Sequence, residues 1–236
     1  MAKVTKESPS EKNTSVLENS DSLAKRILGT SEVLKKNFRI LSIAASVIAA
    51  FIIGYLIYLY ISSEQEREAQ TEMFASVYYF EADSLNKALK GDGNYKGFLA
   101  IIEDYPLSKA ANLARFYAGT AYLKKGEFQK AIEHLQKFSS SDLLIQARAY
   151  SLIGDAYLEL KKTDDAITYY KKAVDYKPNK FFTPSYLMKL GLAYELKNDK
   201  SSALQQYERV QKDFFDAPEA VNAKKYKAKL ETELGK

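Results

Sequence analysis

The chain contains no cysteine and only one histidine among its 236 residues. Without cysteine it can form no disulfide, no thiolate metal site and no lipid attachment through an N-terminal cysteine. The single histidine, His134, has no cysteine and no helically spaced carboxylate pair beside it, which argues against a metal site. We expect His134 to be an exposed surface residue. We also expect the protein to hold no metal and no cofactor.

Sequence motifs of catalysis are missing as well. The chain has no glycine-rich phosphate loop, no Gly-x-Ser-x-Gly and no His-Glu-x-x-His. Two acidic pairs, Glu103-Asp104 and Asp164-Asp165, are adjacent in sequence, so on a helix their side chains point about 100° apart and cannot converge on one atom. We expect both pairs to be helix-capping residues or solvated surface charges. The sequence therefore predicts no catalytic residue, no small-molecule substrate and no enzymatic activity.

A basic stripe of the kind that binds nucleic acid is also absent. The formal net charge is +5, of which +3 belongs to residues 1–39 and +2 to the rest of the chain. Mixed charges of this kind are typical of solvated helix faces. We expect no nucleic-acid partner.

One long run, from Ile40 to Ile61, has no charged side chain. As a helix, at about 1.5 Å per residue, it reaches about 33 Å, enough to cross a hydrocarbon core of about 30 Å. A buried core helix would show a polar face, and a signal peptide starts nearer the N-terminus and has a shorter apolar stretch. Three tyrosines near its end suit the membrane–water interface: Tyr55, Tyr58 and Tyr60. We predict a single transmembrane helix over residues 40–61.

The charges on either side of this run predict its orientation. Acidic residues dominate after the run, beginning with Glu64 and Glu66. Basic residues stand directly before it, and we take them to set the topology: Lys35, Lys36 and Arg39. Because excess Lys and Arg stay on the cytoplasmic side, we expect a cytoplasmic N-terminus. The C-terminal domain would then lie in the periplasm of a bacterium, held at the inner membrane.

The first 39 residues form the predicted cytoplasmic tail. Residues 1–20 are polar and rich in Ser, Glu, Lys and Asn, which favours disorder. Residues 21–34 form a short amphipathic stretch interrupted at Gly29. A weak helix on the inner leaflet is one interpretation of this stretch. A docking segment for a cytoplasmic partner is the other.

Three segments after the run repeat a common pattern. Each contains a glycine followed twelve residues later by an alanine, and the glycines stand about 35 residues apart: Gly119, Gly154 and Gly191. A small residue suits the point where two helices cross closely, with an aromatic filling the space beside it. The second segment has the fullest set: Tyr150, Ile153, Gly154, Tyr157, Ala166, Tyr170 and Pro178. This order resembles the tetratricopeptide repeat, which has a period of about 34.

The other two segments depart from that pattern in places. The first carries Arg115 at the large position and Ala118 for the leucine, and the third carries Leu187 for the aromatic. The resemblance implies pairs of helices stacked as a right-handed solenoid. We predict an all-α protein, with one N-terminal transmembrane helix followed by this tetratricopeptide-like solenoid.

Further helices flank the three repeats. Apolar spacing predicts one long helix from about Glu64 to Leu89 and a short one from Tyr95 to Tyr105, a degenerate first repeat. A last helix opening at Pro218 has the half-polar surface of a solenoid cap. We therefore divide the chain into a tail, a membrane helix, a long helix with a degenerate repeat, three repeats and a capping helix: 1–39, 40–61, 62–110, 111–216 and 217–236.

In such repeats the first helix of each pair lines the groove. We expect the groove to bind an extended or helical protein segment, because it lacks the ordered Lys and Asn set that clamps a partner's terminal carboxylate. Its predicted lining is Phe116, Thr120, Leu123, Ser151, Asp155, Leu158, Met188, Leu192 and Glu195.

The arrangement as a whole resembles YfgM, a family of ancillary subunits of the bacterial Sec translocon. A basic tail, one membrane helix and periplasmic repeats occur there in the same order. The stretches 91–105 and 109–119 look like the version found in Bacteroidetes-type bacteria. The resemblance covers about residues 35–234. It implies association with SecY, SecE and SecG and with the membrane-anchored chaperone PpiD, where the protein handles exported nascent chains.

Two functional hypotheses follow. The first is a non-enzymatic translocon accessory that holds PpiD or a nascent chain near the channel exit. The second is a structural scaffold for another envelope assembly, such as cell-wall synthesis or outer-membrane export. Depletion of a scaffold should alter cell shape or one secretion system, whereas loss of the accessory should perturb many exported proteins mildly.

Overall fold

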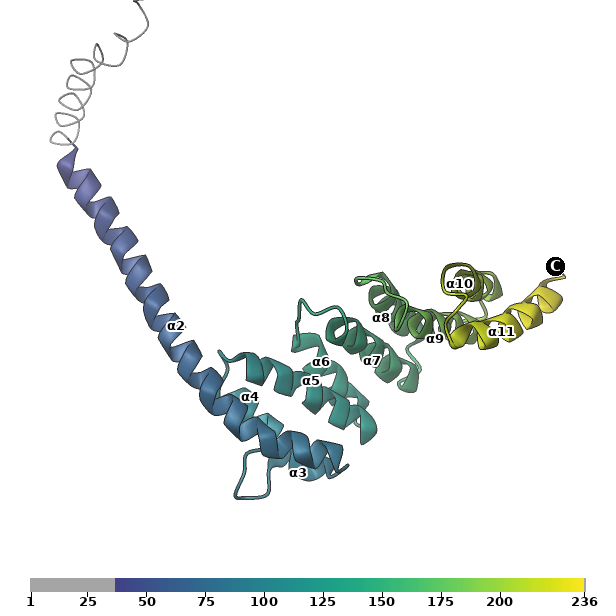
Figure 1. Ribbon diagram of the computed structural model, residues 1–236, viewed down its shortest axis with the longest axis horizontal. Coiled ribbons are helices and arrows are strands. Elements are labelled where there is room, and N and C mark those ends of the chain that lie inside the picture. The colour runs from purple at the N-terminus through teal and green to yellow at the C-terminus, as the bar shows by residue number, and fades with distance from the viewer. Residues whose placement is uncertain (1–36, 236) are drawn as a thin grey trace, which may run out of the picture. The chain divides into compact units, whose positions relative to one another are not determined.

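A computed structural model describes residues 37–235, which are helical and contain no β-strand (Figure 1). The chain divides after Tyr60 into two compact units, Met1–Tyr60 and Ile61–Lys236. The predicted features of the tail, including its amphipathic stretch, Lys35 and Lys36, lie outside the described residues.

The described part of the first unit belongs to one helix, α2 (Phe38–Glu81), which continues into the second unit. Its most apolar 18-residue window has a mean hydropathy of 2.5 and no buried residue. Within residues 37–235 this is the one helix long and apolar enough to cross a membrane. The prediction of one N-terminal helix that is long and apolar enough to span a membrane is thus confirmed, while the bounds 40–61 of the span stay a prediction.

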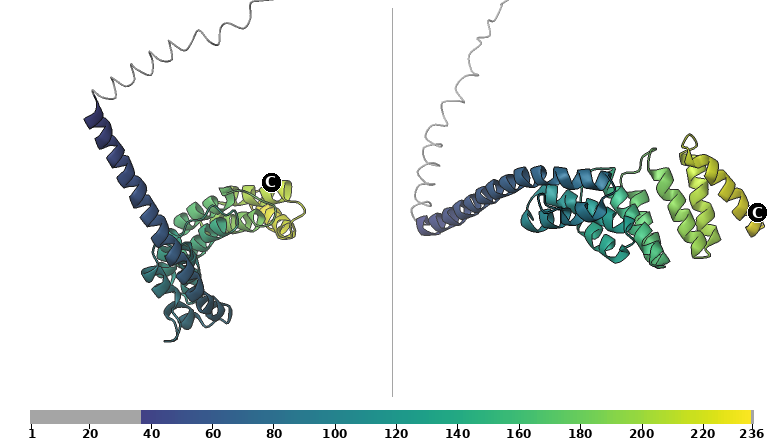
Figure 2. Two further views of the ribbon diagram at one scale, coloured as in Figure 1. Left: turned by 60° about the vertical axis from the view of Figure 1, so that its left-hand side comes forward. Right: turned by 90° about the horizontal axis from the view of Figure 1, so that it is seen from below.

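The second unit is a stack of helical hairpins (Figures 1 and 2). The end of α2 and two short helices precede three regular hairpins and a closing helix. In chain order these helices are α3 (Leu85–Lys90), α4 (Phe98–Asp104), α5 (Lys109–Lys124), α6 (Phe128–Lys137), α7 (Ile145–Glu159), α8 (Thr163–Asp175), α9 (Thr183–Leu196), α10 (Lys200–Asp213) and α11 (Glu219–Leu234). The regular hairpins are α5–α6, α7–α8 and α9–α10. The predicted all-α solenoid is confirmed.

Two predicted helix boundaries differ from those in the structure. The helix expected to reach Leu89 ends at Glu81, because Asp83 adopts a left-handed conformation with φ of 55° and α3 starts afresh at Leu85. The helix expected from Tyr95 begins only at Phe98. Tyr95 lies instead in a turn closed by the Asp92 carboxylate, which accepts hydrogen bonds from two backbone N–H groups.

Each hairpin is held by a close crossing of its two helices at the repeat glycine. A Cβ atom on Gly154 would lie 2.6 Å from the ring of Tyr170, and one on Gly191 would lie 2.5 Å from the ring of Tyr207. Both rings are almost completely buried. In the first hairpin the Leu135 side chain occupies the same place, 2.5 Å from a Cβ on Gly119. The glycines are therefore required by packing and not by their backbone angles.

The turn inside each hairpin also repeats. The residue two positions after the first helix has a positive φ: 76° at Gly126, 59° at Lys161 and 64° at Asn198. In each turn the next N–H bonds back to the carbonyl of the repeat tyrosine, for example Glu127 to Tyr122 at 2.9 Å. This is the hydrogen-bonding pattern of a helix end capped by a left-handed residue.

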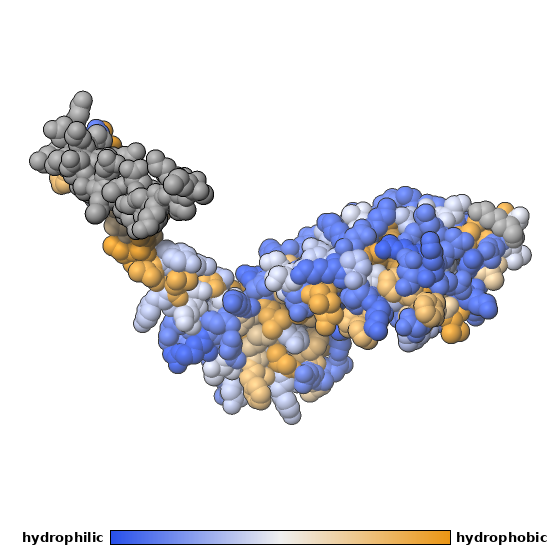
Figure 3. Space-filling model, turned by 45° about the horizontal axis from the view of Figure 1, so that its top comes forward, coloured by the Kyte–Doolittle hydropathy of each residue, from blue (hydrophilic) through white to orange (hydrophobic). Residues whose placement is uncertain are grey.

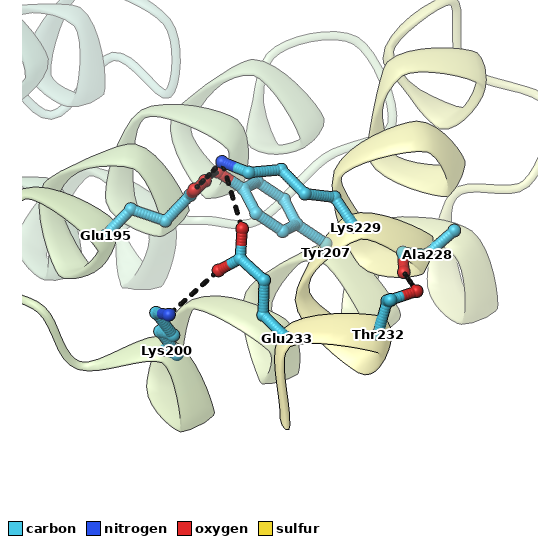
Figure 4. A network of polar contacts seen from close by, with 7 residues as sticks. All are labelled: Glu195, Lys200, Tyr207, Ala228, Lys229, Thr232 and Glu233. Carbon is cyan, nitrogen blue, oxygen red and sulfur yellow. Dashed lines mark hydrogen bonds and ion pairs between the residues drawn. The ribbon is translucent and has the colours of Figure 1, made fainter. Parts of the chain in front are cut away.

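Successive hairpins are joined by a carboxylate that serves two helices at once. Asp155 on α7 accepts a hydrogen bond from the Tyr170 hydroxyl at 2.6 Å and pairs with the Lys189 ammonium of α9 at 2.6 Å. Glu195 on α9 accepts from the Tyr207 hydroxyl at 2.6 Å and pairs with Lys229 of α11 at 3.1 Å (Figure 4). The lysine follows the carboxylate by 34 residues in both cases.

The boundary between the first two regular hairpins lacks this bridge. Thr120 stands where Asp155 stands in the next hairpin, and its hydroxyl donates to the Phe116 carbonyl of its own helix at 2.8 Å. Apolar packing closes the boundary, with Phe116 and Leu135 in one buried cluster with Ile153. The Gln136 side chain of α6 also donates to the Tyr169 hydroxyl of α8 at 2.8 Å, so the boundary has neutral hydrogen bonds but no ion pair among the described residues.

The glycine crossing predicts the effect of adding one methyl group. Gly154→Ala should lower the free energy of unfolding by about 1–3 kcal/mol, because overpacking against Tyr170 outweighs the gain in helix propensity of about 1 kcal/mol. Urea unfolding of the full chain in detergent, followed by circular dichroism, measures this. Ser201→Ala, at an exposed helical position, should change stability by less than about 0.5 kcal/mol. If the Gly154→Ala protein were more stable than the unaltered protein, a close helix crossing at Gly154 would be contradicted.

The inter-hairpin bridge predicts a measurable coupling. In a double-mutant cycle of Asp155→Asn and Lys189→Met, the coupling energy should be about 1 kcal/mol, since the side chains are 27% and 37% exposed. The matched control is the surface pair Glu133–Lys137, whose side chains are 60% and 63% exposed and whose coupling should stay below about 0.5 kcal/mol. Equal coupling in the two cycles would show that the bridge contributes no more than a surface ion pair.

Candidate protein-binding surface

The first helices of the hairpins, together with the closing helix, present one continuous surface, which we call the A face: α5, α7, α9 and α11. The lysine bridges from α9 to α7 and from α11 to α9 hold these helices next to one another. All nine predicted groove residues lie on these helices. The structure divides them into buried, paired and accessible side chains.

Two of the nine are buried. Phe116 is 8% exposed and packs on Phe138, with ring centroids 5.4 Å apart. Ser151 is 2% exposed, and its hydroxyl accepts a hydrogen bond from Lys189 at 3.2 Å. Both side chains support the boundary between hairpins, and a partner on the A face would not reach them without a rearrangement.

Asp155 and Glu195 are the charged members of the predicted set, and both are already paired. Burial and the nearby Asp155 carboxylate raise the pKa of Tyr170 far above its usual range, so this tyrosine stays protonated and donates. Burial and the Glu195 carboxylate raise the pKa of Tyr207 in the same way. Because both carboxylates are paired within the protein, their main role is to hold the helices of the A face together and not to bind a ligand.

A hollow of about 280 Å³ lies on the A face between α9 and α11. Leu192, which is 50% exposed, and the partly buried Met188 form its apolar wall on α9. The remaining lining comes from α9, α10 and α11: Ser185, Lys189, Tyr207, Glu219, Asn222 and Tyr226. An apolar wall with a few polar groups beside it suits a side chain of a bound segment.

Tyr226 lies on the predicted capping helix and was not among the nine predicted groove residues. In the structure its ring stacks on Tyr207 with centroids 5.4 Å apart, is 38% exposed and lines the hollow. Lys189 and Asn222 were not predicted at all. The half-polar surface predicted for α11 gave the only available signal, because no repeat pattern extends across this helix.

The other three predicted residues are partly buried. Thr120 bonds within its own helix, while Leu123 and Leu158 pack against core clusters beneath the face. Whether any of the nine contacts a partner stays a prediction.

A second apolar hollow, of about 350 Å³, lies between the end of α2 and the start of α5. Phe74 is 80% exposed there, beside Met73, Val77 and Leu113. The Glu66 carboxylate accepts a hydrogen bond from the Ala110 N–H at 3.1 Å and so ties the two helices together.

The surface offers no grouping suited to metal binding in the part of the chain that the structure describes. Among residues 37–235 no three His, Cys, Asp or Glu side chains gather closely enough to hold an ion. The prediction that His134 is exposed is wrong: its ring stacks on Tyr122 at 5.4 Å and is half-buried, which lowers its pKa. Tyr122, on the other helix of the same hairpin, shelters this imidazole from water.

Comparison with known families identifies the repeats. Models of the tetratricopeptide repeat match residues 116–181 and 185–214. These ranges contain the three glycine crossings and the inter-hairpin bridge from Asp155 to Lys189. No curated protein matches the chain in sequence.

Solved structures share the fold at low sequence identity. A crystal structure of nearly identical repeats, described as those of a kinesin light chain from Podosopora anserina, has a TM-score of 0.56 and 12% identity. It covers 72% of this chain and 88% of its own. A crystal structure of the MamA protein has a TM-score of 0.50 and 19% identity, over 70% of this chain and 92% of its own.

These likenesses concern the fold alone, and the family matches concern the repeats. Repeats of this kind form protein-interaction scaffolds that are not typically enzymes. Residues 116–181 and 185–214 therefore match tetratricopeptide repeats, and repeats of this kind indicate a protein–protein interaction module.

Proposed function

We propose that this protein is a membrane-anchored, non-enzymatic receptor that binds segments of other proteins on its A face. The observation that carries the proposal is the hollow between α9 and α11, where an exposed Leu192 stands beside Met188 and Tyr226 on a repeat scaffold. An exposed apolar wall on a protein-interaction fold is the kind of surface that anchors a partner side chain.

The apolar part of α2 supplies the anchor. Its side chains are exposed along residues 38–60, which is costly in water and favourable in lipid. The cations before the run and the carboxylates after it favour a cytoplasmic N-terminus and repeats on the far side of the inner membrane, in the periplasm.

The resemblance to the YfgM family supports a particular set of partners. The order of tail, span and repeats is shared, and it points to SecY, SecE and SecG, to a PpiD-like chaperone and to exported chains that emerge from the channel. On this proposal the A face holds an extended or helical segment of the chaperone or of an emerging chain close to the membrane.

The absence of cysteine makes the topology directly measurable. Single variants Ser15→Cys and Ser201→Cys place one thiol on each side of the proposed span. In intact cells with a permeable outer membrane, a membrane-impermeant maleimide should label Ser201→Cys and spare Ser15→Cys. The cysteine-free parent controls for background, and lysed cells should label both variants. The reverse pattern would invert the proposed orientation.

The A-face hollow predicts which side chain a partner needs. Leu192→Lys should reduce co-purification of SecY and PpiD from mild detergent at least tenfold, because it places a charge on the apolar wall. Val221→Lys is the matched control: Val221 is 77% exposed on the neighbouring helix and does not line the hollow.

Photo-crosslinkers at Met188 and Leu192 then identify the partner in cells. Crosslinks to PpiD, SecY or exported chains support the translocon role. If neither SecY nor PpiD co-purifies with the unaltered protein, the translocon role fails, and crosslinks to one other envelope assembly would favour the scaffold role instead.

A further inference from the structure

The loops that join one hairpin to the next all carry exposed apolar side chains. Because consecutive helices run antiparallel, these loops fall along one edge of the stack (Figures 1 and 2), which we call the loop edge: residues 105–108, 138–144, 176–182 and 214–218. Its large apolar residues that are at least 38% exposed are Leu107, Leu143, Leu144, Phe181, Phe182 and Phe215. Phe181 and Phe215 are the most exposed, at 72% and 78%.

The opposite edge has a different character. Its turns, within the hairpins, consist mainly of charged and polar residues: 125–127, 160–162 and 197–199. The exposed large apolar residues near this edge are Leu196, at the end of α9, and Tyr95, in the loop before α4. Figure 3 shows orange patches among the blue surface of the repeats. The apolar side chains of the loops are thus a property of one edge and not of all exposed turns.

Hydrogen bonds tie the first loop of this edge to the residues that directly follow the apolar run. The Ser62 hydroxyl donates to the Leu107 carbonyl at 3.0 Å, and the Leu107 N–H donates to the Gln65 side chain at 3.0 Å. Ser62 and Gln65 lie within four residues of Ile61, which is about 6 Å along a helix. The headgroup region on each side of a bilayer is about 6 Å thick. Leu107 is therefore held at the level where a span ending at Ile61 would meet the headgroups.

We propose that the loop edge rests on the lipid surface and inserts its apolar side chains between the headgroups. The proposal relies on the membrane anchor proposed above, and adds a second contact that the anchor does not require. Apolar side chains that lie in this boundary region bury their surface to a depth of about 5–10 Å.

The charge of the loop edge favours a lipid surface over an ionic protein partner. Its four loops carry two acidic side chains and two basic ones, all exposed: Asp142, Asp216, Lys177 and Lys180. With no net charge, the edge has no electrostatic attraction for a charged patch on another protein. Its apolar side chains stand on separate loops, and a deformable bilayer accepts such separate insertions without a matching set of pockets.

The chain has no tryptophan, so one introduced tryptophan reports its surroundings alone. We would reconstitute full-length Leu144→Trp and Phe181→Trp proteins into phosphatidylcholine vesicles with and without brominated acyl chains. Bromine quenches tryptophan fluorescence only within the bilayer. Both variants should lose at least half of their emission in brominated vesicles. Lys162→Trp, at an exposed position on the opposite edge, should lose less than a tenth.

Phe51→Trp, within the apolar run, separates this inference from the anchor itself. If Phe51→Trp is quenched while both loop variants behave like Lys162→Trp, the anchor stands and the lipid contact of the loop edge is refuted. If Phe51→Trp is not quenched, the anchor fails and the inference fails with it. Quenching at Phe51, Leu144 and Phe181 with none at Lys162 is the result that supports it.

Discussion

The close approach of two helices at a glycine is the constraint on which the repeat stack depends. At Gly154 and Gly191 the missing Cβ lets a buried tyrosine ring lie against the backbone of the first helix. The ring then places its hydroxyl beside a carboxylate on that same helix. With one oxygen engaged by tyrosine, the carboxylate can still pair with the lysine of the next hairpin. Packing inside one hairpin thus determines how the following hairpin is attached.

Sequence periodicity predicted the helix pairs well, because glycine, alanine and aromatic spacing directly reflects a helix crossing. It could not predict the backbone conformation of the turns, since Lys161 and Asn198 adopt the left-handed conformation that a glycine indicates only at Gly126. The break at Asp83 was missed for the same reason. The lysine bridges could not be predicted either. Each joins residues 34 positions apart, and such a contact depends on the rotation between successive hairpins, which no local sequence pattern contains.

The candidate site was predicted as a face and not as a set of accessible residues. The helical register placed Phe116 and Ser151 on the correct helices, yet both are buried where neighbouring hairpins meet. In the second hairpin the bridging carboxylate, Asp155, directly follows the repeat glycine. In the third hairpin the bridging carboxylate is Glu195, one helical turn later, and the residue that follows the glycine is the exposed Leu192. A pattern that treats all repeats alike cannot show this exchange, which opens the apolar hollow.

The unequal boundaries between hairpins have a mechanical consequence. Apolar packing resists separation but tolerates small rotations, because it is non-directional, whereas a hydrogen-bonded ion pair has a preferred geometry. The boundary at Thr120 has apolar packing and hydrogen bonds from Gln136 to uncharged tyrosine hydroxyls but no ion pair among the described residues, whereas those at Asp155 and Glu195 have an ion pair as well. A force that bends the stack would therefore be taken up mainly between α5 and α7, and the helices from α7 to α11 would move together as a stiffer arm.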